Sequence, residues 1–140
     1  MVWLLWKVEL LMVTTEKLIA CAQKAASKAY VPYSQFAVGA AVVTATGEVF
    51  SGCNIENASF GLTNCAERTA IFKAISEGYR DLTALVVYGN THQPIAPCGA
   101  CRQVMAEFFS PAASVTLVGQ TTQRTMTVSE LLPYAFRELS

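Results

Sequence analysis

Two of the chain's five cysteines, Cys98 and Cys101, are separated by two residues at the start of a segment with helical spacing. This spacing lets both sulfurs point at one metal ion. Redox-active dithiols use the same spacing. The pair alone therefore leaves a metal site and a redox site open.

A third cysteine favours the metal. Cys65 stands at the start of another predicted helix, and the N-termini of two helices facing one point would stabilise anionic thiolates, the ligands that zinc prefers. Three sulfur ligands leave one tetrahedral position open for water, which is typical of a catalytic site, whereas a structural zinc site has four protein ligands. We predict zinc at Cys65, Cys98 and Cys101. A closed site that also uses Cys53 is the alternative.

Glu67 follows Cys65 by two residues and is placed to reach a water at the open position without binding the metal. An ordinary solvated helix glutamate is the other interpretation. Zinc with three thiolates carries a net negative charge, so a nearby cation is expected. Arg68 and Arg102 are the candidates, and Arg102 also fits a surface charge. The single histidine, His92, fits a surface loop better than a ligand, and it leaves a serine-hydrolase triad little to build from.

Composition limits the partners. The 140 residues fit one domain, and ten basic and ten acidic residues give no net charge, which argues against binding a nucleic acid polymer. The hydrophobic fraction of 53% suggests surface covered by other subunits. An odd number of cysteines fits a reducing cytoplasm. The apolar start carries Lys7 and Glu9 and is shorter than the roughly 20 residues that span a bilayer.

We expect residues 1–14 to be an N-terminal extension of unknown role and residues 15–140 to form a single domain. A helical lead-in, a docking segment and an upstream extension before Met12 remain open for the first part. In the domain, helices alternate with strands, which predicts an α/β fold. The expected elements are a helix over 15–28 ended by Pro32, a hairpin over 35–56 turning at 46–47, a helix over 65–78, a strand over 82–89, a helix over 98–109, strands over 114–120 and 125–128, and a last helix over 129–136 capped by Ser129.

The sequence CAE at 65–67, followed after about thirty residues by PCGAC at 97–101, resembles the signature of zinc-dependent nucleoside and nucleobase deaminases. The segments YSQFAVGAAV, GCNIENASFGLTNCAERTAIFKAISEG, APCGACRQVMAEF and LLPYAF together resemble the small cytidine deaminase family. This resemblance implies a three-layer α/β/α fold with a mixed five-stranded sheet and one Zn²⁺ per subunit. It also implies a homotetramer with shared active sites that deaminates cytidine and 2′-deoxycytidine in pyrimidine salvage.

The resemblance also assigns roles to individual residues. It implies that Glu67 transfers protons, that Phe36 packs against the pyrimidine and that Ala66 binds it through the backbone. Asn54 and Glu56 would bind the ribose 3′-hydroxyl, Arg68 would support the metal ligands, and Phe136 would approach the base from a neighbouring subunit. Phe60 departs from the family, because several members have tyrosine there. The alternatives are a blasticidin-type aminopyrimidine deaminase and a non-catalytic zinc-stabilised interaction module.

Overall fold

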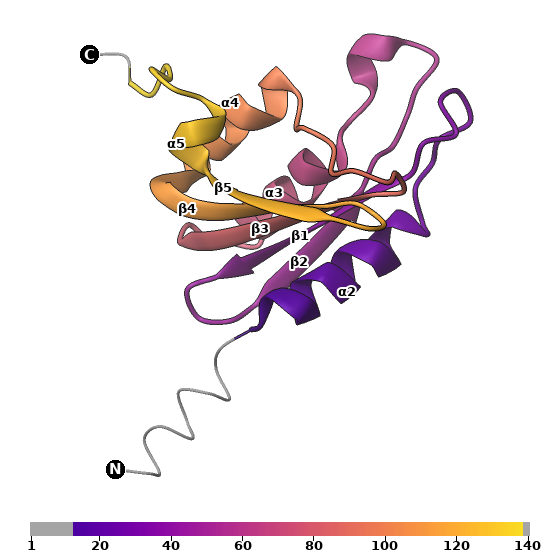
Figure 1. Cartoon of the computed structure of the whole chain (residues 1–140). Helices are drawn as coiled ribbons and strands as arrows, with labels where there is room; N and C mark the ends of the chain where they lie inside the picture. The colour runs from indigo at the N-terminus through magenta and orange to yellow at the C-terminus, as the bar shows by residue number, and fades with distance from the viewer. Residues whose placement is uncertain (1–12, 139–140) are drawn as a thin grey trace.

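A five-stranded sheet forms the middle layer of the computed structural model, which describes residues 13–138 (Figure 1). The strand order is β2-β1-β3-β4-β5, with β3 and β4 parallel and the other neighbours antiparallel. This confirms the predicted mixed sheet. The strands are β1 (Val38–Thr44), β2 (Val49–Cys53), β3 (Leu82–Gly89), β4 (Phe109–Val118) and β5 (Gln123–Thr127).

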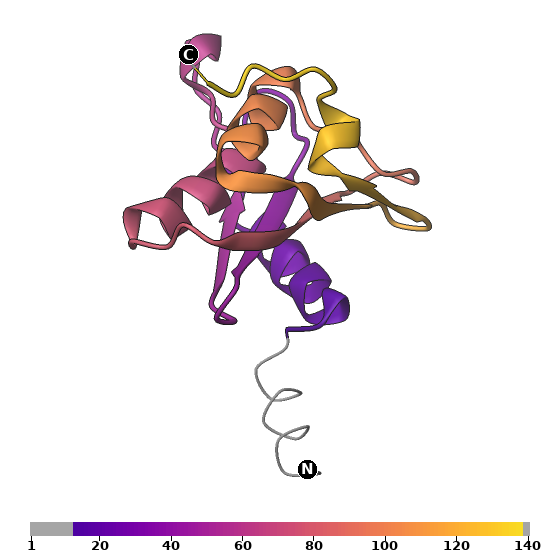
Figure 2. The same cartoon turned by 90° about the vertical axis from the view of Figure 1, so that its left-hand side faces the viewer.

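Helices cover both faces of the sheet. Successive side chains of β1 point to opposite faces, so Ala40 and Val42 join one hydrophobic core while Ala41 and Val43 join another. The first core lies between the sheet and the helices α3 and α4, and the second lies between the sheet and α2. Figures 1 and 2 show α2 below the sheet and α4 and α5 above the sheet. The three-layer α/β/α prediction is confirmed. The helices are α2 (Thr15–Ala26), the 3-10 helix η1 (Phe60–Leu62), α3 (Ala66–Ser76), α4 (Gly99–Phe108) and α5 (Val128–Leu131).

Turn and capping residues fix the ends of several elements. Gly47 has φ of 90° between β1 and β2, a conformation that glycine adopts without steric strain. Gly78 has φ of 98° just after α3 and ends that helix. Thr14 caps α2 by accepting a hydrogen bond from the Lys17 backbone.

Three predicted boundaries are wrong. The helix α2 ends at Ala26, well before Pro32, and the Ser27 hydroxyl donates to the Lys24 carbonyl to close its last turn. The final helix, α5, covers only four residues and is capped by Thr127 rather than Ser129. Its short length follows from Pro133, because a residue before proline is driven toward extended backbone and Leu132 has φ of −142°.

The strand β4 begins at Phe109, five residues before the predicted start at Ser114. Phe109 pairs with Leu82, and the register between β3 and β4 then shifts before Ala84 pairs with Ser114. Polar and small residues in this irregular part hide the strand from a pattern search.

Residues 1–12 lie outside the described residues, so the predicted N-terminal extension stays a prediction. Within residues 13–138, none of the helices has the length and apolar character needed to cross a membrane.

Gly39 sets how closely β1 approaches α2. A Cβ atom added there would lie 1.8 Å from the Ala22 carbonyl oxygen and 2.6 Å from the Ala26 nitrogen. We expect Gly39→Ala to lower the free energy of unfolding by about 3 kcal/mol, because backbone must move to relieve the clash. Urea denaturation measures the loss. Gly61→Ala is the control, since a Cβ there meets nothing within 4 Å, and equal stability of the two variants would contradict the prediction.

Candidate active site

Three sulfurs meet at one end of the sheet. Cys65 immediately precedes α3, Cys98 immediately precedes α4, and Cys101 lies in the first turn of α4. Their sulfurs all lie within 4.8 Å of one another, and those of Cys65 and Cys98 are 3.8 Å apart. A tetrahedral zinc ion with Zn–S bonds of about 2.3 Å separates two sulfurs by about 3.8 Å. The three residues therefore fit zinc.

Cys53 does not belong to this cluster. It lies half-buried on β2 and lines a separate cleft together with Cys21. The closed four-cysteine site considered from the sequence is thus not formed, and the cluster keeps one tetrahedral position without a protein thiolate.

Both helices direct their N-termini at the sulfurs. Cys65 and Cys98 occupy the N-cap positions of α3 and α4 with extended backbone, and neither side chain makes a capping hydrogen bond. The first N–H groups of each helix and the positive end of its dipole therefore face the thiolates. This arrangement favours negative charge on sulfur.

The neighbours of Cys65 and Cys101 shift the pKa values of these two thiols in opposite directions. A hydrogen bond from Cys101, with smaller contributions from Arg68 and Cys98, lowers the pKa of Cys65 to about 5. The same bond and burial raise the pKa of the Cys101 thiol above its ordinary value. The cluster by itself therefore favours a thiolate at Cys65, and a bound divalent cation would favour deprotonation of the remaining thiols.

Arg68 supplies the expected cation. Its Nη2 donates to Cys65 Sγ at 3.3 Å. The guanidinium of Arg102 turns elsewhere, because it donates to the carbonyls of Pro97 at 2.8 Å and Leu131 at 2.9 Å. Arg102 therefore joins α4 to α5 and to the preceding loop, while Arg68 faces the sulfurs. His92 is exposed and does not belong to the cysteine cluster.

Glu67 is 4% exposed, so the interpretation as a solvated helix glutamate is wrong. Burial raises the pKa of Glu67 to about 7, and the charge of Cys65 acts in the same direction. A carboxyl group with a pKa near neutrality can both accept and release a proton at physiological pH. A bound cation would oppose this rise.

The carboxyl group opens into a pocket of about 210 Å³, smaller than several other hollows of the described surface. Its walls include Phe36, Asn54 and Ala66, three residues that the resemblance assigns to substrate. The sequence reasoning missed Thr63, Ile95 and Ala96, which also line it. They lie in loops and carry no motif that could have revealed them. The remaining lining residues are Val38, Cys65, Glu67 and Cys98.

Glu56 lies in an adjoining hollow, which shares Thr63 with the first pocket. Its Oε1 accepts hydrogen bonds from the backbone N–H groups of Tyr33 at 3.0 Å and Ser34 at 3.1 Å. A side-chain hydrogen bond with Ser34 contributes most to lowering the pKa of Glu56. The carboxylate is therefore ionised and held in place, with Oε2 free of these two bonds.

Asn54 braces the pocket wall. Its Oδ1 accepts from the Val38 N–H at 2.9 Å, and its Nδ2 donates to the Phe36 carbonyl at 2.8 Å. Each group retains capacity for a second hydrogen bond. The side chain therefore fixes the aromatic wall and can also meet a ligand.

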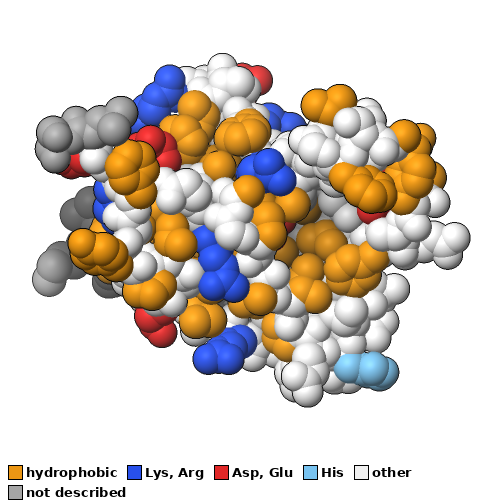
Figure 3. All heavy atoms as spheres, turned by 90° about the horizontal axis from the view of Figure 1, so that it is seen from above, with side chains coloured by type: hydrophobic (Ala, Val, Ile, Leu, Met, Phe, Trp, Pro, Cys, Tyr) orange, Lys and Arg blue, Asp and Glu red, His pale blue; other side chains and the backbone are white. Residues whose placement is uncertain are grey.

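Phe136 does not enter this chain's own pocket. It is 64% exposed in the C-terminal segment, and its carbonyl accepts from Gln103 Nε2 at 2.7 Å. Phe60, in η1, is 80% exposed and borders the hollow of Glu56. Figure 3 views the molecule from above relative to Figure 1 and shows hydrophobic side chains over much of that upper face.

Comparisons with known proteins agree with this geometry. A family described as "Cytidine and deoxycytidylate deaminase zinc-binding region" matches residues 12–117. The chain is 57% identical over 123 residues to cytidine deaminase of Halalkalibacterium halodurans, covering 86% of this chain and 92% of that protein. It is 52% identical over 124 residues to cytidine deaminase of Sporosarcina psychrophila, covering 86% and 90%. A crystal structure of cytidine deaminase from Burkholderia pseudomallei superposes with a TM-score of 0.86 at 55% identity, covering 89% of this chain and all of that one.

The fold and the three-sulfur centre place the protein among the zinc-dependent deaminases. Within that class, the chain belongs to the cytidine and deoxycytidylate deaminase family.

Removal of one sulfur should release the metal. We expect the purified protein to hold one zinc ion per chain and Cys98→Ala to lose it on dialysis against a chelator, because two thiolates bind far more weakly than three. Cys53→Ala is the matched control and should keep its zinc, since Cys53 lies outside the cluster. Elemental analysis measures both. Retention of zinc by Cys98→Ala, or its loss from Cys53→Ala, would contradict the assignment.

Proposed function

We propose that the protein hydrolytically deaminates cytidine and 2′-deoxycytidine to uridine and 2′-deoxyuridine with release of ammonia. The observation that carries this proposal is the buried Glu67 carboxyl group, which shares a small pocket with Cys65 and Cys98. The two curated relatives described above are cytidine deaminases and support the same substrate class.

The chemistry needs a nucleophile and a proton carrier. A zinc ion held by Cys65, Cys98 and Cys101 would supply the Lewis acidity that makes water nucleophilic near neutral pH. Glu67 accepts one proton from the water whose oxygen attacks C4 of the pyrimidine and delivers it to N3. Glu67 then moves the second proton of that water from the new C4 hydroxyl to the amino group, so that C4=O forms, the C4–N bond breaks and ammonia leaves.

Other residues orient the substrate. In this proposal, Phe36 packs against the pyrimidine, and the backbone at Ala66 hydrogen-bonds its polar edge. The two ribose-binding groups, Asn54 and Glu56, receive the 3′-hydroxyl, and the free Oε2 of Glu56 is the acceptor for it. Recognition through the 3′-position allows both ribose and deoxyribose to bind.

We also propose that four copies assemble and share active sites, with Phe136 of one copy approaching the base in another. The exposure of Phe136 and its absence from this chain's own pocket support this arrangement.

We further propose that residues 15–140 form one deaminase domain and that residues 1–14 are an extension of unknown role. None of the five cysteines forms a disulfide, which supports a reducing, cytoplasmic location, as expected for an enzyme of pyrimidine salvage.

The proton carrier can be tested directly. Glu67→Gln should keep zinc but lose at least about 100-fold in kcat, because an amide cannot accept the water proton. Loss of ultraviolet absorbance from cytidine measures kcat, and elemental analysis measures zinc. Glu107→Gln removes an exposed carboxylate of α4 and should behave as wild type. Turnover by Glu67→Gln at the wild-type rate would exclude the proposed mechanism.

Substrate selection tests the proposed binding of the ribose 3′-hydroxyl by Asn54 and Glu56, which we call the ribose clamp. Wild type should turn over cytidine and 2′-deoxycytidine but not cytosine or blasticidin S. Glu56→Gln should lower kcat/KM for both nucleosides by roughly 10- to 100-fold, because it removes a charge-assisted hydrogen bond. Turnover of blasticidin S alone would favour the antibiotic deaminase, and bound zinc with no reaction on any of the four compounds would favour the interaction module. A Glu56→Gln variant with unchanged kcat/KM would exclude the clamp.

A further inference from the structure

A second cleft lies on the far side of β2 from β1, between α2 and α3. We call it the lysine cleft, because it is lined by Lys24 of α2, Lys28 of the turn that follows α2, and Lys73 of α3. Its volume is about 470 Å³, and it shares no lining residue with the substrate pocket. It is therefore a separate feature that the deaminase chemistry does not use.

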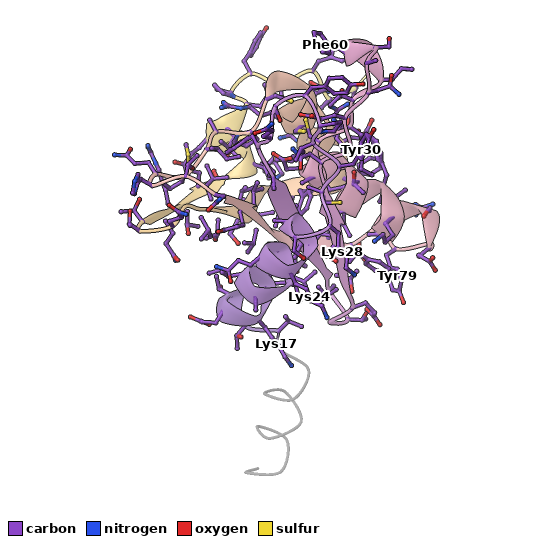
Figure 4. The ribbon with its side chains drawn as sticks, turned by 90° about the vertical axis from the view of Figure 1, so that its right-hand side faces the viewer. Lys17, Lys24, Lys28, Tyr30, Phe60 and Tyr79 are labelled. Atoms are coloured by element: carbon purple, nitrogen blue, oxygen red, sulfur yellow. The ribbon has the colours of Figure 1, made fainter. Side chains whose placement is uncertain are left out.

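The cleft concentrates one sign of charge. All three charged lining residues are lysines, and none of the lining residues is acidic. Lys24 lies in the last turn of α2, and Lys28 lies in the turn just after the helix ends at Ala26. Figure 4 shows Lys24 and Lys28 on the way toward Tyr30, with Lys17 farther down near the start of α2. The chain as a whole carries no net charge, so this positive cluster is a local feature rather than part of a general excess.

The edge strand adds backbone donors. Hydrogen bonds from Thr44 to Glu48 and from Asn54 to Val38 fix which groups of β2 pair with β1. Because these bonds alternate along an antiparallel pair, the backbone groups of Ser51 and Cys53 point away from β1. Lys73 confirms this direction, since its Nζ donates to the Ser51 carbonyl at 2.7 Å. The N–H groups of Ser51 and Cys53 therefore face the same side of the strand as the lysine cleft.

We propose that the lysine cleft binds small anions that carry phosphate groups. Ammonium groups and backbone N–H donors converging from three elements match the oxygens of a phosphate chain. The lining includes no aromatic side chain on which a base could stack, and three lysines in one hollow do not make the long basic track that a polynucleotide needs. The proposal is independent of the reaction at the zinc centre.

The choice of variants follows from the contacts in the cleft. Thr69 also lines it, but its hydroxyl donates to the Cys65 carbonyl at 3.1 Å and is bonded by Asn64 at 3.0 Å. A change at Thr69 would therefore disturb the metal centre. Lys24 in α2 and Lys28 just after it are both exposed, so replacing them with glutamine removes charge with little effect on stability.

The test is calorimetric titration of the zinc-loaded protein with inorganic tripolyphosphate at low salt. Wild type should bind it, and the double variant Lys24→Gln/Lys28→Gln should bind at least about tenfold more weakly, because it loses two charge-assisted contacts. Lys17→Gln, on the same helix but outside the cleft, should bind as wild type. Titrations with orthophosphate and with CTP then distinguish a simple phosphate ligand from a nucleoside polyphosphate.

Three results would overturn the proposal. The first is that wild type does not bind tripolyphosphate, and the second is that Lys17→Gln lowers the affinity for tripolyphosphate as much as the double variant does. The third is that saturating cytidine displaces tripolyphosphate. The last result would place the anion in the substrate pocket. Cytidine turnover by the double variant should equal that of wild type, which separates failure of this site from failure of the deaminase assignment.

Discussion

The two helices that carry the sulfurs begin without the side-chain caps that stabilise α2 and α5. Thr14 caps α2 and Thr127 caps α5 through side-chain hydrogen bonds, whereas Cys65 and Cys98 make none at the starts of α3 and α4. A missing cap costs about 0.5–2 kcal/mol. A cation bound only by the folded chain offsets that loss, because its binding free energy adds to folding stability. The site and the stability of α3 and α4 thus depend on the same sulfurs.

The sheet brings these helix starts together from distant parts of the sequence. α3 follows the hairpin of β1 and β2, and α4 connects the parallel strands β3 and β4, so both helices pack on the same face of the sheet. Ile71 from α3 and Met105 from α4 are fully buried in the shared core. Their packing determines the separation of Cys65 and Cys98 before any metal binds.

Sequence patterns correctly predicted the features that depend on residue type and on spacing between residues close together in the sequence. The CxxC pair, the helical stripe of α3 and the apolar run of β3 each leave a local signal, and the structure places all three as expected. The burial of Glu67 leaves none, because it depends on packing across the pocket. The predicted helix boundaries were wrong where a side-chain hydrogen bond to the backbone sets the end of the helix, as at Ser27 and Thr127. Pocket walls from loops, such as Thr63 and Ile95, depend on tertiary placement alone.

The bracing by Asn54 limits how the enzyme could be adapted to other pyrimidine analogues. One side chain both lines the pocket and holds the backbone at Phe36 and Val38, so varying it in directed evolution would change the shape of the wall along with its chemistry. Ile95 and Ala96 line the same pocket with apolar side chains that make no such hydrogen bonds. Libraries at these two positions would alter the space for the base while leaving the scaffold of the site intact.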